Sequence, residues 1–140
     1  MKVAVIEDHL PVRQLLVRRA EKLDGLRVVA QASGEDEAVD AVLATVPDVV
    51  LLDLRLAQGT GLSVLNRLRD QDYAGQVFVL SGEDAGTHAA ACRRHGADAF
   101  YDKAFDFEQL LSDLHDLCKR AAANGPLHPM RHGQRAVANG

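Results

Sequence analysis

Residues able to do chemistry follow short apolar runs at several places in the chain. The acidic pair Glu7-Asp8 follows the first run, and Asp53 ends the third. Ser81-Gly82 closes the fourth run, and Lys103 stands two residues after the fifth. Carboxylates, a hydroxyl and an ammonium group therefore recur at equivalent positions, each next to a segment that can form a buried strand.

These groups have a chemistry in common if they meet. Three carboxylates placed together repel one another, so each resists ionisation. A hard divalent cation relieves that repulsion, and Mg²⁺ prefers oxygen ligands of this kind. An ammonium group and a hydroxyl beside them can hold the oxygens of an anion. A carboxylate nucleophile, a metal site, an ammonium group and a hydroxyl are together what phosphoryl transfer to an aspartate requires.

The elements that must position these groups alternate regularly along the chain. Apolar, β-branched runs predict strands, and apolar residues at helical spacing predict helices between them. Ser33 is expected to cap the second helix and Pro47 to close it. The predicted strands are Val3–Ile6, Leu26–Ala30, Asp48–Asp53, Gln76–Ser81 and Ala97–Tyr101, and the predicted helices are centred on residues 12–23, 33–46, 62–68, 85–95 and 107–118.

This alternation predicts the fold class. Continuously apolar strands between amphipathic helices indicate a parallel sheet covered on both faces. Right-handed crossovers then give a three-layer, doubly wound α/β domain of the (βα)5 type with a five-stranded parallel sheet. Ligands bind beyond the carboxyl ends of the strands in such sheets, which is where the acids, Ser81 and Lys103 fall.

Composition and charge exclude several classes of protein. No apolar run approaches the ~20 residues of a membrane span, and the chain turns acidic too early for a signal peptide. Cys92 and Cys118 form no metal-binding pattern and are expected to be reduced thiols in a cytoplasmic protein. Residues 119–140 hold four basic residues and no acid, whereas the rest holds 12 basic and 20 acidic residues. We expect a domain over residues 1–120, a basic, flexible tail over 121–140, and no nucleic-acid or membrane partner.

Four segments resemble the receiver domain of bacterial two-component response regulators, the chemotaxis-regulator fold. The segments are Val5-Ile6-Glu7-Asp8-His9, Val50 to Leu56 followed by Gly61, Leu80-Ser81-Gly82, and Gly96 to Lys103. The resemblance covers Lys2 to about Arg120 and implies the flavodoxin-like strand order 2-1-3-4-5. It also implies a phosphoprotein that takes its phosphoryl group from a sensor histidine kinase or a histidine phosphotransfer protein.

The resemblance also implies a role for each site residue. Asp53 would be the phospho-acceptor, and Mg²⁺ would be held by Asp8, Asp53, Glu7 and the backbone carbonyl of Arg55. Ser81, Gly82 and Lys103 would bind the phosphoryl group. Ser81 and Phe100 would form the switch, and Arg55 and Glu83, each two residues after a site residue, would tune the lifetime of the phosphorylated state.

The family's pattern is broken at two positions. Ala104 stands where the family has a proline after the lysine, and Ala57 stands where it has a proline four residues after the acceptor. The proline after the lysine is commonly cis, but a cis Lys103–Ala104 bond would cost roughly 3 kcal/mol, so a trans bond is expected. The shapes of these two loops are therefore open, whereas the reacting groups are all present.

Several functions remain open at this stage. The preferred one is a single-domain receiver that is not an enzyme beyond its own phosphorylation and slow autodephosphorylation. Its downstream protein would bind the face of the fourth helix, fifth strand and fifth helix, and two copies could pair on phosphorylation. The chain could also be the receiver portion of a longer transcriptional regulator. A haloacid-dehalogenase-like phosphatase would need a second acid where Arg55 stands, and a nucleotide or flavin site lacks its glycine-rich loop.

Overall fold

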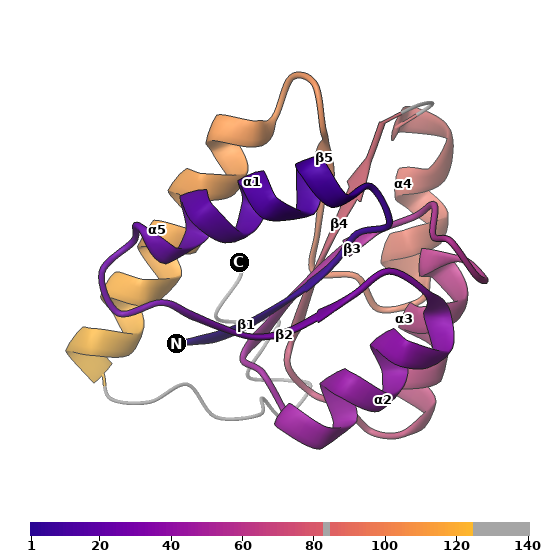
Figure 1. Ribbon diagram of the computed structural model, residues 1–140, viewed down its shortest axis with the longest axis horizontal. Helices are drawn as coiled ribbons and strands as arrows, with labels where there is room; N and C mark the ends of the chain where they lie inside the picture. The colour runs from indigo at the N-terminus through magenta and orange to yellow at the C-terminus, as the bar shows by residue number, and fades with distance from the viewer. Residues whose placement is uncertain (83–84, 125–140) are drawn as a thin grey trace.

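Five strands and five helices alternate along the part of the chain that the computed structural model describes, residues 1–82 and 85–124 (Figure 1). The predicted order of elements is confirmed. The elements are β1 (Lys2–Ile6), α1 (Leu10–Glu21), β2 (Arg27–Ala32), α2 (Glu35–Thr45), β3 (Val49–Asp53), α3 (Gly61–Asp70), β4 (Gln76–Ser81), α4 (Ala85–Arg94), β5 (Ala99–Asp102) and α5 (Phe107–Asn124).

The strands form one parallel sheet in the order β2-β1-β3-β4-β5. This confirms the doubly wound α/β fold and its flavodoxin-like order. β3 is central, and all of its residues are buried, as expected for a strand that is apolar up to its last residue. The register pairs Ile6 with Leu52, Asp53 with Leu80 and Ser81 with Asp102. The polar residues at the carboxyl ends therefore lie level with one another.

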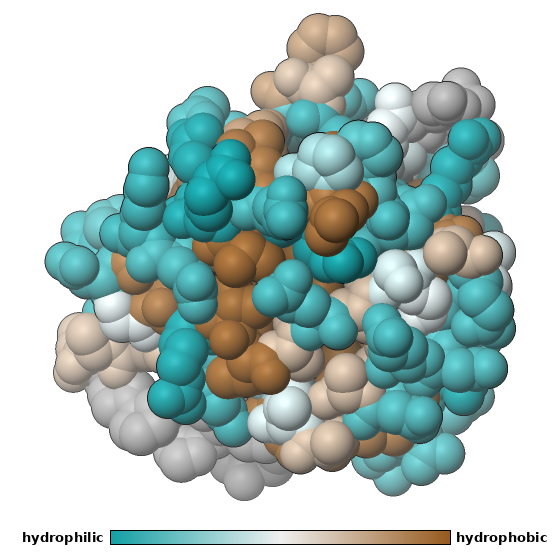
Figure 2. All heavy atoms as spheres, viewed as in Figure 1, coloured by the Kyte–Doolittle hydropathy of each residue, from teal (hydrophilic) through white to brown (hydrophobic). Residues whose placement is uncertain are grey.

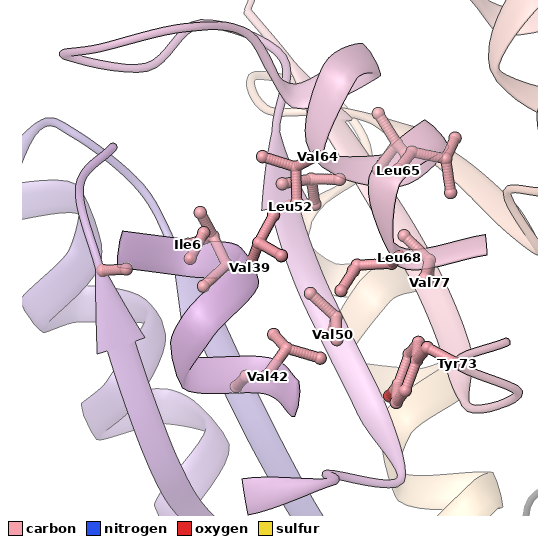
Figure 3. Packing of buried hydrophobic residues seen from close by; sticks show 14 of the residues in the cluster. Ile6, Val39, Val42, Val50, Leu52, Val64, Leu65, Leu68, Tyr73 and Val77 are labelled. Atoms are coloured by element: carbon pink, nitrogen blue, oxygen red, sulfur yellow. The ribbon is translucent and has the colours of Figure 1, made fainter. Parts of the chain in front are cut away.

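Helices cover both faces of the sheet: α1 and α5 lie on one side, and α2, α3 and α4 lie on the other (Figure 1). Because successive strand residues point to opposite faces, the strands contribute side chains to two separate hydrophobic cores, one on each face of the sheet. Ile6, Val50 and Leu52 pack with residues of α2 and α3 (Figure 3). Val49 and Leu51 pack with Leu16 of α1 and with residues of α5. The continuous apolar strands are thus explained by burial on both sides.

The sheet ends at β2, whose central residues are only half-buried. Figure 2 shows apolar side chains at the surface on this side of the molecule, among polar ones. No helix in the described residues is long and apolar enough to cross a membrane.

Two helix ends differ from the sequence-based prediction. Gly34, not Ser33, is the N-cap of α2, and its end of the helix has no side-chain cap of its own. Instead, the Ser33 N–H donates to the carboxylate of Glu37 at 2.9 Å. α5 continues to Asn124, so residues 121–124, assigned above to the tail, prolong the helix. The remainder of the predicted tail, residues 125–140, lies outside the described residues.

Candidate functional site

The candidate site lies at the carboxyl edge of β1, β3, β4 and β5. Glu7 follows β1 next to the end of β3, because Ile6 pairs with Leu52. Lys103 follows β5, and its backbone N–H donates to the Ser81 carbonyl at 2.9 Å, which extends the β4–β5 pairing by one step. Strand register alone therefore brings together residues that are up to 96 positions apart in the chain.

Lys103 bridges two buried acids. Its Nζ lies 2.6 Å from Glu7 Oε1 and 2.8 Å from Asp53 Oδ2. Glu7 is 1% exposed and Asp53 is 4% exposed, whereas the Lys103 side chain is 24% exposed. The ammonium group thus reaches from solvent into the acidic site and partly compensates the negative charge of two buried carboxylates.

Three carboxylates of this site fit a hard divalent cation. Ligand oxygens of Glu7, Asp8 and Asp53 all lie within 4.8 Å of one another. Glu7 and Asp53 are buried, and Asp8 is exposed at the entrance. A set made only of carboxylate oxygens, with one side open for water, suits Mg²⁺. The structure thus brings together the three predicted acidic metal ligands. The fourth predicted ligand, the Arg55 carbonyl, stays a prediction.

Burial and crowding set the ionisation of Glu7. Burial is the largest effect and raises the pKa of Glu7 to about 7, with neighbouring Asp53 acting in the same direction. The bond to Lys103 and the backbone N–H of His9, which donates to Glu7 Oε2 at 3.1 Å, oppose that rise. Burial also tends to lower the pKa of Lys103, but its bonds to Asp53 and Glu7 outweigh burial and leave that pKa raised. A second cation can therefore compete with the Lys103 ammonium group for the carboxylate of Glu7.

Backbone contacts hold the acceptor and the acidic loop in place. The Arg55 N–H donates to Asp53 Oδ1 at 3.2 Å, while Lys103 donates to the other carboxylate oxygen. Arg13 of α1 donates through Nη1 to the backbone carbonyl of Glu7 at 2.8 Å. Sequence reasoning missed Arg13, and its only signal was a basic residue on the first turn of the helix that follows the acidic pair.

Gly61 permits a close backbone approach beside the acceptor. A Cβ at this position would meet the Asp53 carbonyl group, at 2.9 Å from its carbon, and would lie 2.8 Å from Leu54 Cα. The Gly61 N–H donates to the Leu54 carbonyl at 2.9 Å, closing the loop that starts at Asp53. The glycine quoted above as part of the acceptor segment thus has a steric role.

The predicted phosphoryl-binding and switch residues lie at the end of β4 and on β5. Ser81 is buried and Gly82 is exposed at the same edge of the sheet. Phe100 is half-buried and packs against the core on the α2–α3–α4 side. Arg55 is exposed on the loop after Asp53. Glu83 lies outside the described residues, so the lifetime-tuning pair stays a prediction.

The loop after Lys103 is held by side-chain hydrogen bonds at the position where the family has a proline. The Lys103–Ala104 peptide is trans, as expected. Asp102 Oδ1 accepts the N–H of Ala104 at 2.8 Å and that of Phe105 at 3.2 Å. Asp106 in turn accepts the N–H of Asp102 at 2.8 Å. Side-chain bonds thus fix this turn, and Phe105 is left 87% exposed.

Comparison with known proteins identifies relatives along most of the chain. A family model, the response regulator receiver domain, matches residues 3–115. The nitrate/nitrite response regulator protein NarP of Escherichia coli (strain K12) is 35% identical over 125 residues, which is 89% of this chain. The Francisella response regulator 1452 receiver domain superposes with a TM-score of 0.76 at 26% identity, covering 86% of this chain and 98% of that chain. A LuxR-family DNA-binding response regulator from Staphylococcus aureus has the same fold, with a TM-score of 0.76 at 20% identity over 84% of this chain and 98% of that chain.

The relatives are longer than the chain. The match covers 55% of NarP, so the chain spans about half the length of the curated relatives it matches. The Staphylococcus aureus protein is a DNA-binding response regulator. The expectation that the chain has no nucleic-acid partner is therefore unsupported by these comparisons.

Proposed function

The chain belongs to the response regulator receiver domain family, and on that premise we propose that Asp53 accepts a phosphoryl group from a phosphohistidine donor. The donor is a sensor histidine kinase or a histidine phosphotransfer protein. The observation that carries the proposal is the convergence of Asp53 with Lys103 and with the acidic pair Glu7-Asp8 at one edge of the sheet.

The groups around Asp53 support an in-line transfer. An oxygen of the Asp53 carboxylate forms the new P–O bond while the P–N bond of the donor breaks, and the electron pair of that bond returns to the donor imidazole. The Arg55 N–H and the Lys103 ammonium hold the two carboxylate oxygens in a fixed orientation. Lys103 and the Ser81 hydroxyl then bind the oxygens of the transferred group.

We propose that Mg²⁺ occupies the carboxylate cluster, held by Asp8, Asp53, Glu7 and the Arg55 carbonyl. When bound, it neutralises negative charge that develops on the phosphoryl oxygens. The proximity of three carboxylates and the raised pKa of Glu7 support this assignment. Lys103, which contacts Glu7 and Asp53 here, would be available to the phosphoryl group if the two carboxylates held the metal.

The output is a change of surface. In this proposal, Ser81 moves toward the bound phosphoryl group, and Phe100 turns inward into the space that Ser81 leaves. The face formed by α4, β5 and α5 then binds a downstream protein or a second copy of the chain. The chain acts on no other substrate, apart from slow hydrolysis of its own aspartyl phosphate.

A second candidate concerns the whole protein. The chain covers about half of its curated relatives, which favours a receiver that regulates an attached output segment in a longer transcriptional regulator. The competing proposal is a receiver that acts alone on a separate partner. The length of the protein produced from the chromosome, measured by intact mass, separates the two.

The test of the proposed function uses acetyl phosphate as the donor. With Mg²⁺, the intact protein should gain the mass of one phosphoryl group, and with EDTA it should gain none. A phosphatase of the haloacid-dehalogenase kind would instead turn over p-nitrophenyl phosphate many times without retaining the phosphoryl group. Sustained turnover with no mass gain would overturn the proposal.

A further inference from the structure

The N-terminus of α2 is capped by a residue from another loop. Helix starts leave backbone N–H groups without intrahelical partners, and the N-cap, Gly34, has no side chain to accept them. Gln58, on the loop between β3 and α3, does so instead. Its backbone carbonyl accepts the Glu35 N–H at 2.7 Å, and its side-chain Oε1 accepts the Asp36 N–H at 3.0 Å. The loop after the acceptor aspartate is therefore hydrogen-bonded to the first turn of α2.

Glu35 returns the contact from α2 to the same loop. Its Oε1 accepts the Thr60 N–H at 3.2 Å. Its Oε2 accepts the Ser63 hydroxyl at 2.7 Å and Arg67 Nη1 at 2.9 Å. The side chain is only 13% exposed, although it lies at the start of a helix that covers the sheet. We call the contacts of Gln58 and Glu35 across the two segments the α2 clasp.

The backbone between these contacts is shaped to admit Glu35. Gly59 has a φ of +75°, a conformation that side chains rarely adopt, and a Cβ there would lie 2.9 Å from the Glu35 carboxyl carbon. Two residues before Gly59, the Ala57 N–H donates to the Ser33 carbonyl at 2.9 Å. Residues 57–60 are thus fixed to the start of α2 and to the segment just before it by both backbone and side-chain bonds.

The clasped loop is also the loop that carries the expected fourth metal ligand. It leaves the sheet at Asp53, and Arg55 and Thr60 pair across it as an isolated antiparallel bridge. Thr60 is one of the residues bound by Glu35, so the α2 clasp fixes the strand segment opposite Arg55. A metal ligand supplied by a backbone carbonyl has no side-chain freedom with which to adapt. Its position depends wholly on how the loop is held.

We propose that Glu35 and Gln58 are positioning residues for Mg²⁺ binding: the α2 clasp holds the β3–α3 loop in the conformation that presents the Arg55 carbonyl to the carboxylate cluster. The proposal rests on the proposed function, because it assumes that the cluster binds Mg²⁺. Neither residue touches the metal. Groups hydrogen-bonded directly to metal ligands change metal affinity roughly 10- to 100-fold when removed, and the clasp acts on Arg55 through Thr60, so we expect an effect near the lower end of that range.

The experiment measures the Mg²⁺ dissociation constant by isothermal titration calorimetry, without any phosphoryl donor. Gln58→Ala and Glu35→Gln should each weaken Mg²⁺ binding about tenfold or more. Gln58 is exposed, so its truncation leaves the core unchanged, and it changes no charge. Glu35→Gln keeps the size of the side chain but cannot accept both the Ser63 hydroxyl and Arg67 on the replaced oxygen.

Two matched controls separate positioning from charge and from simple truncation. Glu37→Gln removes the same charge from the first turn of α2, and the partner of Glu37 among the described residues is the Ser33 N–H, which precedes the helix. Gln71→Ala truncates an exposed glutamine at the end of α3, at the opposite edge of the sheet. Both controls should bind Mg²⁺ within about twofold of the wild type.

The outcomes distinguish the inference from the function on which it rests. If the wild type binds no Mg²⁺ and gains no phosphoryl group, the proposed function fails. If the wild type binds Mg²⁺ and both clasp variants bind it equally well, the inference is wrong and the function stands. Equal weakening in Glu37→Gln would also overturn it, because charge alone would then explain the loss. If Glu35→Gln fails to fold, Gln58→Ala decides the question.

Discussion

At the scale of single residues, Glu7 and Asp53 are two buried acids that share the ammonium group of Lys103. Taking a carboxylate out of water is costly, and the cost falls mainly on Glu7, whose pKa is raised to about 7 by burial. Burial of these acids therefore lowers the stability of the folded protein before any ligand binds. This electrostatic cost leads to two predictions about stability.

The first prediction concerns pH. Between about pH 4.5 and 7, Glu7 ionises in the unfolded chain but stays largely protonated in the folded protein. The unfolded state then binds fewer protons, so the free energy of unfolding should fall as pH rises through this window. Urea denaturation in EDTA measures this fall, and Glu7→Gln should remove its contribution. A wild type that shows the same pH profile as Glu7→Gln would contradict the assignment.

The second prediction concerns Lys103→Met, which removes the positive charge but keeps most of the side-chain volume. Removing one partner of a buried ion pair costs about 3–5 kcal/mol, and partial exposure of Lys103 places the expected loss near ~3 kcal/mol at pH 7.5. The loss should shrink at pH 5.5, because Glu7 can then be protonated. Combining Lys103→Met with Glu7→Gln should also recover part of the loss. A destabilisation that is independent of pH would show that lost packing, not charge, is responsible.

At the scale of elements, the close passage of α3 beside β3 depends on Gly61. A Cβ there would press on backbone atoms of Asp53 and Leu54, which cannot move aside as a flexible side chain can. Gly61→Ala should therefore destabilise the protein by about 2 kcal/mol. In an ordinary helix the same substitution stabilises the protein by about 1 kcal/mol. The sign of the change therefore shows whether Gly61 is required for steric reasons. The midpoint of urea unfolding measures it, and a stabilised variant would refute the steric role.

The elements also show what the sequence could predict and what it could not. The five strands could be predicted because burial on both faces of the sheet requires continuous apolar runs in the sequence. The convergence of the acidic residues could be predicted because the carboxyl ends of parallel strands lie at one edge of the sheet. The cap of α2 could not, because Gln58 supplies it from 24 residues past Gly34, and no local pattern records that contact. Arg13 and the Asp102 turn were missed for a different reason. Their partners are backbone atoms, which are not specified by residue type.

At the scale of the whole molecule, we expect a signal at Asp53, on the central strand β3, to reach the side of the sheet formed by β4 and β5. Ser81 and Phe100 lie on neighbouring strands, and Phe100 packs into the core beneath α3 and α4. A rearrangement there can bias two states of the packed elements above it. Beryllium fluoride with Mg²⁺, a mimic of the phosphoryl group, should therefore shift amide NMR signals mainly within residues 81–110.

Phe100→Leu provides the control for this coupling. The variant should still bind the mimic, with shifts near Asp53, but lose most of the shifts in α4. Changes confined to residues 5–60 in the wild type would contradict the coupling. The same experiment on Gln58→Ala reports whether the α2 clasp is needed only for the metal or also for the transmitted change.

The central claim, that Asp53 is the phospho-acceptor, is tested most directly by intact-mass spectrometry of Asp53→Asn after incubation with acetyl phosphate and Mg²⁺. The wild type should gain one phosphoryl group, and so should Asp48→Asn, a matched change at the residue just before the same strand, outside the site. Asp53→Asn should gain none, although its Asn side chain keeps the size and shape of the acceptor. A variant that is labelled to the same extent as the wild type would contradict the account.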